Sequence, residues 1–333
     1  MLTMNTKSAE SLDELQSWVL ASLLTEGQQA KPRGFQTLEL FPATFTLTRP
    51  RRRCVANPER RWNLPLAIGE FCWHVSGSNE LQFIEYYAKR WREFAEDGST
   101  IRGSCYGHRI FTQTHESRSQ WEQIVELLQK DPASRRAVLN FQEQPEDLVN
   151  EKDIPCASTM QFLIRDSRLH AITCMRSNDA IWGLPYDVFL FTMFQELLAS
   201  ELGLPLGTYT HTVGSLHLYE RHFDLAERIV GVPVVPAAEM PAMEQHGQLR
   251  MFLDLESRLR TGAGVISKDK NALHPYWQDL LTVLEWFRHS KEAGEYEKAS
   301  DKIPLHSPYR IFLSNLAGAP TANPRGYAKH SAA

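Results

Sequence analysis

Residues 155–187 read PCASTMQFLIRDSRLHAITCMRSNDAIWGLPYD, and this stretch carries the main indications of the fold. Two runs of strand-like composition, Thr159 to Ile164 and Leu169 to Met175, flank a turn at residues 165–168. This pattern predicts a β-hairpin. Cys156 therefore lies at a loop-to-strand boundary, immediately before the first strand.

Around this hairpin, helical and strand patterns are mixed along the chain. The predicted helices cover Ser11 to Glu26, Asn63 to Val75, Ser119 to Lys130 and about Asp187 to Ser200. The other predicted strands cover Thr37 to Thr48, Ala137 to Phe141 and Thr208 to Val213, and a loop is expected at Ser177 to Pro185. Because helices and strands do not alternate strictly, the pattern favours an α+β sandwich over a doubly wound parallel fold.

Beyond about Val230 the sequence pattern changes from mixed helices and strands to a linker followed by helices. A linker with Pro233, Pro236 and Pro241 precedes two helical patterns, near Gln248 to Arg260 and Tyr276 to His289. The small, polar residues 317–333 predict a mobile tail. We therefore expect a catalytic core at 1–230 and a divergent helical region at 231–333, packed on that core.

Composition narrows the class of protein. The 333 residues carry a formal charge of −4, which argues against polymeric nucleic acid as a partner because phosphate backbones need clustered cations. Five widely spaced cysteines without CxxC pairs suggest neither a disulfide framework nor a zinc site. No signal-peptide pattern and no membrane-spanning run is recognisable. These features predict a cytoplasmic protein with reduced thiols.

Cys156 and several arginines are candidates for chemistry. A lone cysteine is most often a small core residue. A nucleophilic cysteine must become a thiolate, so we expect cations nearby that lower its pKa. The pair Arg135 and Arg136, and Arg176 followed by Ser177, could supply them. The planar donor fork of arginine also suits phosphate, although isolated arginine pairs are usually solvated surface groups.

The order of these short segments along the chain is more specific than any one of them. It runs as follows: Pro32-Arg33-Gly34, Glu70 within Gly69-Glu70-Phe71-Cys72-Trp73, Tyr106-Gly107, Asp131-Pro132-Ala133-Ser134-Arg135-Arg136, Pro155-Cys156, Gln161-Phe162, Arg176-Ser177-Asn178-Asp179, Gly183-Leu184-Pro185-Tyr186-Asp187 and His217-Leu218-Tyr219. This succession, from about residue 12 to 225, resembles thymidylate synthase and the related cytidylate hydroxymethylases. The resemblance implies a three-layer sandwich whose mixed β-sheet forms a homodimer interface.

The resemblance implies a covalent mechanism. Cys156 adds to C6 of a pyrimidine ring and makes C5 nucleophilic toward 5,10-methylenetetrahydrofolate, the one-carbon co-substrate. Glu70 transfers protons through ordered water, and burial between Ile68 and Phe71 is expected to raise the pKa of its carboxyl group. Tyr106 and Asp187 are the other catalytic positions, and no metal is expected.

The resemblance also implies the nucleotide contacts. Arg33, Arg176 and Ser177 hold the phosphate, while Arg135 and Arg136 reach over from the other subunit, so that the active sites are composite. Holding the phosphate makes the attack effectively intramolecular, an effect worth about 7–11 kcal/mol when the geometry is good.

His217 and Tyr219 are two residues apart on an extended segment and therefore point to one side. The resemblance places them on the sugar 3′ hydroxyl, although either could be an ordinary core side chain. It implies further nucleotide contacts from Gln161, Asp179 and Asp187. On the folate side it implies Trp91, Asp179, Gly183, Tyr186, Arg60 and Arg61.

Asp187 departs from the thymidylate synthase pattern. Those enzymes carry asparagine after Gly-Leu-Pro-aromatic, and an amide both donates and accepts. An ionised carboxylate only accepts hydrogen bonds, so it opposes O4 of uracil and suits the N4 amino group of cytosine with a protonated N3. Such a mismatch costs about 1–3 kcal/mol. The alternative is that Asp187 only caps the helix that follows.

The C-terminal end departs too. Thymidylate synthases end in a short apolar segment that seals the folate site, whereas this chain continues and ends at Ala333. A less sealed pocket allows water to add to the exocyclic methylene intermediate, which gives a hydroxymethyl product.

The sequence therefore predicts a cytidylate 5-hydroxymethyltransferase that acts on CMP or dCMP. One alternative is a thymidylate synthase that reductively methylates dUMP. A non-catalytic nucleotide- or RNA-binding relative is a further alternative, opposed by the presence of Cys156, Glu70 and Arg176. Ribose and deoxyribose both stay open, as do the pathway and the role of residues 231–333.

Overall fold

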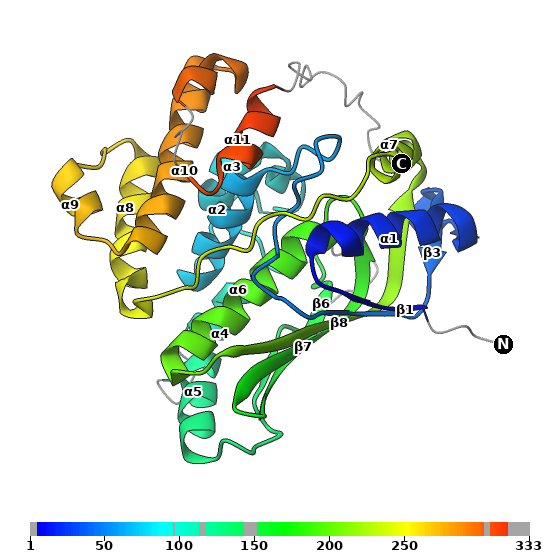
Figure 1. The fold of residues 1–333 in the computed structure, drawn as a ribbon, viewed down its shortest axis with the longest axis horizontal. Coiled ribbons are helices and arrows are strands. Elements are labelled where there is room, and N and C mark those ends of the chain that lie inside the picture. The colour runs from blue at the N-terminus through cyan, green and yellow to red at the C-terminus, as the bar shows by residue number, and fades with distance from the viewer. Residues whose placement is uncertain (1–4, 96, 113–117, 143–151, 303–306, 319–333) are drawn as a thin grey trace.

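A mixed β-sheet of eight strands, counted over the described residues, is the base of the fold in this computed structural model (Figure 1). The structure describes residues 5–95, 97–112, 118–142, 152–302 and 307–318. The strands are β1 (Asn5–Ala9), β2 (Gln28–Ala30), β3 (Thr37–Leu40), β4 (Ala43–Leu47), β5 (Val138–Asn140), β6 (Ala157–Arg165), β7 (Arg168–Asp179) and β8 (Leu206–Tyr219). They run in the order β1-β4-β8-β7-β6-β5, and β3 pairs with both β2 and β8.

The centre of the sheet confirms the predicted hairpin. β6 and β7 pair antiparallel around a tight turn in which Asp166 and Ser167 both have positive φ. β7 then pairs parallel with β8, which sets Ser177 opposite Ser215 and Asp179 opposite His217. Two central strands from segments about forty residues apart in the chain therefore end side by side.

Several boundaries differ from the sequence prediction. The strand expected at Thr208 to Val213 extends to Tyr219 in β8, and the helix expected from about Asp187 begins at Leu184. The expected strand Thr37 to Thr48 is two strands, because Pro42 has no N–H to donate and the chain bends there. The expected loop at Ser177 to Pro185 is shorter, since β7 continues to Asp179. Polar turn residues 177–179 remain extended because the parallel pairing with β8 satisfies their backbone.

Helices cover one face of this sheet. They are α1 (Leu12–Glu26), α2 (Leu64–Val75), α3 (Leu81–Tyr87), α4 (Tyr106–Phe111), α5 (Gln120–Lys130), α6 (Leu184–Leu202), α7 (Phe223–Gly231), α8 (Leu249–Thr261), α9 (Ser267–Asn271), α10 (Pro275–Ala293) and α11 (Arg310–Ala317). α1 begins at Ser11, whose side chain accepts from the backbone of Glu14, and α5 begins with a full capping box at Ser119.

The helices form two layers above the sheet. The apolar helix α6 lies directly on β7 and β8, beside α1 (Figure 1). α2 packs on α6 from outside, and α10 packs on α2 and α8. Burial alternates along β7, where Leu169, Ala171 and Thr173 are buried and Cys174 is exposed on the other face. This α+β arrangement of layers confirms the predicted fold class.

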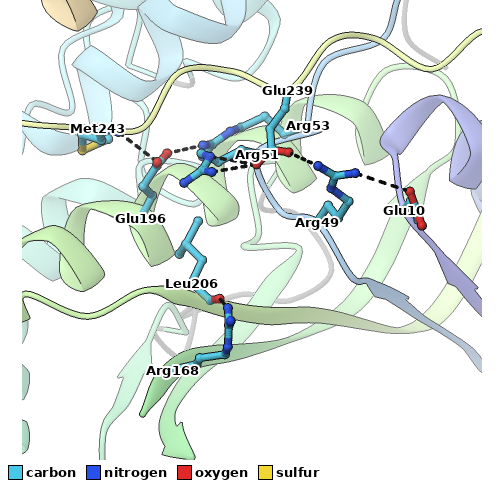
Figure 2. Close-up of polar contacts among 9 residues, drawn as sticks. All are labelled: Glu10, Arg49, Arg51, Arg53, Arg168, Glu196, Leu206, Glu239 and Met243. Carbon is cyan, nitrogen blue, oxygen red and sulfur yellow. Dashed lines mark hydrogen bonds and ion pairs between the residues drawn. The ribbon is translucent and has the colours of Figure 1, made fainter. Parts of the chain in front are cut away.

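The segment between α7 and α8 is fixed to the core by charged groups. Arg53 and Glu196 form an ion pair in which both side chains are buried, and Glu196 also accepts from the backbone N–H of Met243 at 3.0 Å. Nearer the surface, Glu239 pairs with Arg49 at 2.7 Å and Arg51 at 2.8 Å (Figure 2). These contacts bind residues 239–243 to α6 and to the chain before α2.

The C-terminal helices lie over α2 and α3. The hydroxyl of Tyr87 donates to Glu256 of α8 at 2.7 Å, and Arg260 pairs with the same carboxylate. The division of the chain at residue 230 stays a prediction. Residues 319–333, which make up almost all of the predicted mobile tail, lie outside the described residues.

Candidate active site

A cavity of about 370 Å³ opens where β7 and β8 end and α6 begins. Its volume is within the usual range for small-molecule sites. Thirteen of the residues proposed from the sequence line it: Arg33, Glu70, Trp91, Tyr106, Cys156, Arg176, Ser177, Asp179, Gly183, Tyr186, Asp187, His217 and Tyr219. They come from segments spread between residues 33 and 219, and the packing of α2, α4 and α6 on the sheet brings them together.

Cys156 lies at the start of β6, beside Arg176 of β7. Nη2 of Arg176 is 3.7 Å from Sγ of Cys156, and the same guanidinium donates to the carbonyl oxygens of Pro155 at 2.9 Å and Ile154 at 3.0 Å. Burial raises the pKa of the Cys156 thiol, and Arg176 opposes that rise. The expectation of a lowered pKa is therefore not met in the free chain, because the loss of water outweighs the effect of the nearby cations Arg176 and Arg33.

Two carboxyl groups face the same cavity and both hold protons unusually well. Burial raises the pKa of Glu70 on α2 to about 8, against an opposing effect of Arg90. Burial raises the pKa of Asp187 on α6 to about 7, although a hydrogen bond from Asn178 lowers it. Raised pKa values in a cleft are typical of groups that transfer protons near neutral pH.

Asp187 does not cap a helix. α6 begins at Leu184 with Gly183 as the preceding residue, so Asp187 lies inside the first turn. Its Oδ2 accepts from Nδ2 of Asn178 at 2.7 Å instead of from a helix N–H. The alternative of a simple capping role is thus wrong, and the carboxyl group lines the cavity.

Tyr106 connects α4 to the strand that follows Cys156. The backbone N–H of Ala157 donates to the Tyr106 hydroxyl at 3.3 Å, and the ring stacks on His74 with centroids 5.5 Å apart. A Cβ on Gly107 would lie 1.9 Å from the carbonyl oxygen of His74, so only glycine allows α4 to approach α2 this closely. This contact holds Tyr106 against the base of the cavity.

His217 and Tyr219 share one side of β8, as expected from their spacing. Their rings meet edge to face at 5.0 Å, and Nδ1 of His217 is 3.5 Å from Oγ of Ser177. Arg33 is exposed and left-handed, with φ of 49°, in a short turn that reaches the same rim. The cations and hydroxyls at this rim suit a phosphate and a sugar.

The outer end of the cavity is aromatic and cationic. The guanidinium groups of Arg90 and Arg221 lie 4.6 and 5.0 Å from the Trp182 ring. Asp179 fixes this loop, because its Oδ1 accepts from the backbone N–H groups of Ile181 at 2.7 Å and Trp182 at 3.0 Å. A flat heterocycle with anionic groups fits such a surface.

The family model described as thymidylate synthase matches residues 17–253. The chain belongs to the thymidylate synthase family. It is 28% identical over 308 residues to the deoxyuridylate hydroxymethyltransferase of Bacillus phage SP01, covering 88% of this chain and 79% of that protein. It is 31% identical over 182 residues to the deoxyuridylate hydroxymethyltransferase of Pseudomonas phage M6, covering 54% of this chain and 51% of that protein.

Membership of the thymidylate synthase family makes the chain a folate-dependent one-carbon transferase that acts on a nucleotide. The cytidylate specificity expected from Asp187 does not follow from family membership, since both relatives are named for deoxyuridylate. Within the described residues, no group of three metal-ligating side chains is assembled. None of the described helices is long and apolar enough to cross a membrane.

Five proposed site residues do not line the cavity of the single chain: Arg60, Arg61, Arg135, Arg136 and Gln161. Arg60 is buried and donates to the carbonyl oxygen of Ile181 at 2.7 Å, so it supports the Trp182 loop from behind. Arg135 and Arg136 are exposed beyond α5, and Gln161 donates to the backbone of Arg135 at 2.8 Å. The roles of these five in binding stay predictions.

Sequence reasoning passed over two residues that shape this thymidylate synthase family site. Asn178 is buried behind Asp187, and Arg90 lies over Trp182. Alternation along β7 would place Asn178 on the face of exposed Cys174 and Arg176, so this pattern gave no signal for its burial. Nothing local marked Arg90, which follows a helix of the second layer and reaches the cavity only through packing.

Proposed function

We propose that this protein transfers a hydroxymethyl group to C5 of a cytosine nucleoside monophosphate, CMP or dCMP, with 5,10-methylenetetrahydrofolate as the one-carbon donor. The observation that carries the choice of base is Asp187, a carboxyl group on the cavity wall that already accepts from Asn178. An ionised carboxylate offers only acceptors to the ligand. Cytosine presents an N4 amino donor there, whereas uracil presents the acceptor O4.

The residues of the chain support the covalent step. Arg176 lies beside Cys156, and a phosphate held by Arg33, Arg176 and Ser177 would fix the pyrimidine so that the Cys156 thiolate adds to C6. The electron pair displaced from the C5–C6 double bond moves onto the ring toward N3, where a proton from an acid in the cavity must meet it.

Glu70 is suited to move protons within this site. Its pKa of about 8 means that the buried carboxyl is mostly protonated at neutral pH and can serve as an acid. The proton released from C5 after the one-carbon unit is attached needs a base in the same cavity. The ionised form of Glu70, reached after one transfer, would supply it.

The outer end of the cavity fits the folate. Trp91 and Trp182 offer flat faces, and Arg90 and Arg221 offer positive charge for the carboxylates of a folate tail. When bound, methylenetetrahydrofolate would supply a carbon at the oxidation level of formaldehyde. Loss of tetrahydrofolate from the carbon attached to C5 would leave an exocyclic methylene on the nucleotide. Water adding to this methylene would give the hydroxymethyl group, as the Cys156 thiolate leaves C6 and the C5–C6 double bond forms again, in agreement with the activity in the names of both phage relatives.

Deoxyuridylate is the second candidate substrate. Both relatives are named deoxyuridylate hydroxymethyltransferase. The raised pKa of Asp187, about 7, gives a physical reason why deoxyuridylate could bind. A neutral carboxyl group can donate to O4 and accept from N3–H of uracil. Reductive methylation of dUMP, as in a thymidylate synthase, is the third outcome to be tested.

We also propose a cytoplasmic homodimer formed through the open face of the sheet, with Arg135 and Arg136 entering the partner's site. Exposed Cys174 and exposed Arg176 mark the uncovered side of β7, while both arginines are exposed on the single chain. An obligate dimer of this kind would complete the phosphate site. Residues 231–333 would then be a divergent helical layer remote from the interface.

One incubation series tests the proposal. The purified protein is given methylenetetrahydrofolate with CMP, dCMP, UMP or dUMP, and the product mass and dihydrofolate absorbance are followed. A hydroxymethyl product from a cytosine nucleotide, without dihydrofolate, is expected. Hydroxymethylation of dUMP alone would overturn the choice of base, and growth of dihydrofolate with dUMP would overturn hydroxymethylation itself. The Cys156→Ala variant, which should still bind nucleotide, is the matched control.

A further inference from the structure

Behind Asp187 lies a buried chain of hydrogen bonds that connects α6 to the middle of β8. Nδ2 of Asn178 donates to Oδ2 of Asp187 at 2.7 Å. Oδ1 of Asn178 is 3.1 Å from Nε2 of His211, and Nδ1 of His211 is 2.7 Å from the Tyr209 hydroxyl. Asn178, His211 and Tyr209 are all buried, so water does not compete for these contacts.

The direction of every bond in this chain is determined. Because Nδ2 of Asn178 is turned to Asp187, its Oδ1 can only accept, and Nε2 of His211 must carry the hydrogen. Nδ1 of His211 then accepts from the Tyr209 hydroxyl. Burial lowers the pKa of His211 to about 3, so the ring is neutral and has one donor and one acceptor. Turning the amide over would place its NH2 group against Nε2–H.

Packing holds the same arrangement. The His211 ring stacks on Phe45 with centroids 5.2 Å apart and planes 11° from parallel. A Cβ on Gly183 would lie 2.6 Å from Nδ2 of Asn178, so the glycine before α6 leaves the space that this amide occupies. Gly183, expected to contact folate, therefore has a second role in admitting Asn178.

We propose that Asn178, oriented by His211 and Tyr209, is a positioning residue that sets base specificity by keeping a hydrogen-bond donor on Oδ2 of Asp187. A donor to a carboxylate oxygen stabilises the ionised form, which accepts from the N4 amino group of cytosine. Burial alone would leave a neutral carboxyl group that can donate to O4 of uracil. The inference rests on the proposed function only in taking Asp187 as the residue that contacts the base edge.

Other ionisable groups face Asp187 and contribute to its charge state. They are Asp179 at the end of β7, Glu70 on α2, Tyr106 on α4, Cys156 before β6 and Tyr209 on β8. Each of them carries negative charge when ionised, so each favours the neutral form of Asp187. Asn178 is thus the group that acts in the opposite direction.

Nucleotide binding tests this inference without requiring turnover. The dissociation constants of dCMP and dUMP, and of CMP and UMP, are measured by calorimetry between pH 6 and 9 for the wild type, Asn178→Leu and Tyr209→Phe. Leucine keeps the approximate shape of asparagine and removes the donor. Tyr209→Phe removes one hydroxyl group, which frees the His211 tautomer while the ring packing is retained.

The preference for cytosine should fall about tenfold or more in Asn178→Leu, and less in Tyr209→Phe, at neutral pH. In the wild type, that preference should rise with pH through about 7 as Asp187 ionises. In Asn178→Leu the midpoint should move to higher pH, which a purely structural role would not cause.

An unchanged base ratio and midpoint in both variants would overturn the inference, as would a wild type without any preference for cytosine. Should Asn178→Leu fail to fold, Tyr209→Phe decides alone. A wild type that binds cytosine nucleotides more tightly but forms no hydroxymethyl product would defeat the proposed function and leave this inference standing.

Discussion

Nη2 of Arg176 lies 3.7 Å from Sγ of Cys156, while the same side chain donates to the carbonyl oxygens of Pro155 and Ile154. One guanidinium group therefore both fixes the chain just before β6 and supplies the positive charge nearest the thiol. It also remains exposed at the rim of the cavity, where a phosphate would bind. Because lysine lacks the planar fork, it cannot replace all three contacts.

Arg176→Gln should raise the pKa of Cys156 further and lower turnover. Since Arg176 opposes the effect of burial on this thiol, its loss shifts the thiolate fraction to higher pH. We expect kcat/KM to fall by about a hundredfold, as is usual when a charged hydrogen-bond partner of the reacting group is removed. The rate of Cys156 alkylation against pH, followed by peptide mass, measures the shift. The background should carry Cys174→Ala, because Cys174 is also exposed.

Glu70→Gln should remove a proton-transfer group without disturbing the fold. Because the pKa of Glu70 is about 8, a wild-type rate that depends on protonated Glu70 should decline above pH 8. The variant should lose about 10²- to 10⁴-fold in kcat and should lack that alkaline limb. Glu93→Gln is a matched control, because Glu93 also lines the cavity but is exposed. Equal losses in both variants would contradict a specific role for Glu70.

The sequence was informative where one short segment forms its own contacts, and it failed where distant segments meet. The hairpin of β6 and β7, the capped helices and the one-sided placement of His217 and Tyr219 follow from alternation and capping along the chain. The length of β7 could not be read locally, because its last three residues are polar and are held only by β8. The direction in which the Cys156 pKa moves likewise depends on burial, which the sequence does not show.

Asp187→Asn should shift the preference toward uracil nucleotides. Asn178 keeps its NH2 group turned to position 187, so the new amide must present its oxygen to Asn178 and its NH2 group to the base. A donor at that point fits O4 of uracil and opposes the N4 amino group of cytosine. The discrimination should change by about 1–3 kcal/mol, or roughly ten- to a hundredfold in relative kcat/KM. Unchanged selectivity, measured by competition between matched nucleotides, would remove the role of Asp187 in reading the base.

Glu196→Gln should destabilise the fold strongly although it lies outside the cavity. Arg53 has no exposed surface in its side chain, so loss of the Glu196 charge leaves a buried cation without its counterion. A free energy of unfolding lower by about 3–5 kcal/mol is expected from urea denaturation. Glu239→Gln, whose side chain is 26% exposed, should cost less than about 1 kcal/mol. If both variants lost a similar amount of unfolding free energy, burial would not explain the contribution of the Arg53–Glu196 ion pair to stability.

Arg135 and Arg136 do not reach the cavity of their own chain, and this gives a direct test of a composite site. Cys156→Ala should be inactive as a homodimer, and so should the double variant Arg135→Ala with Arg136→Ala. In a mixed dimer, one cavity combines the intact Cys156 of the arginine variant with the intact arginines of the Cys156→Ala subunit. Unfolding and refolding the two variants together should therefore restore about one quarter of the wild-type activity, since half of the dimers are mixed and each has one complete site. Refolding each variant alone is the control. If the mixture stays inactive while nucleotide-binding dimers form, the two arginines act within their own chain or not at all.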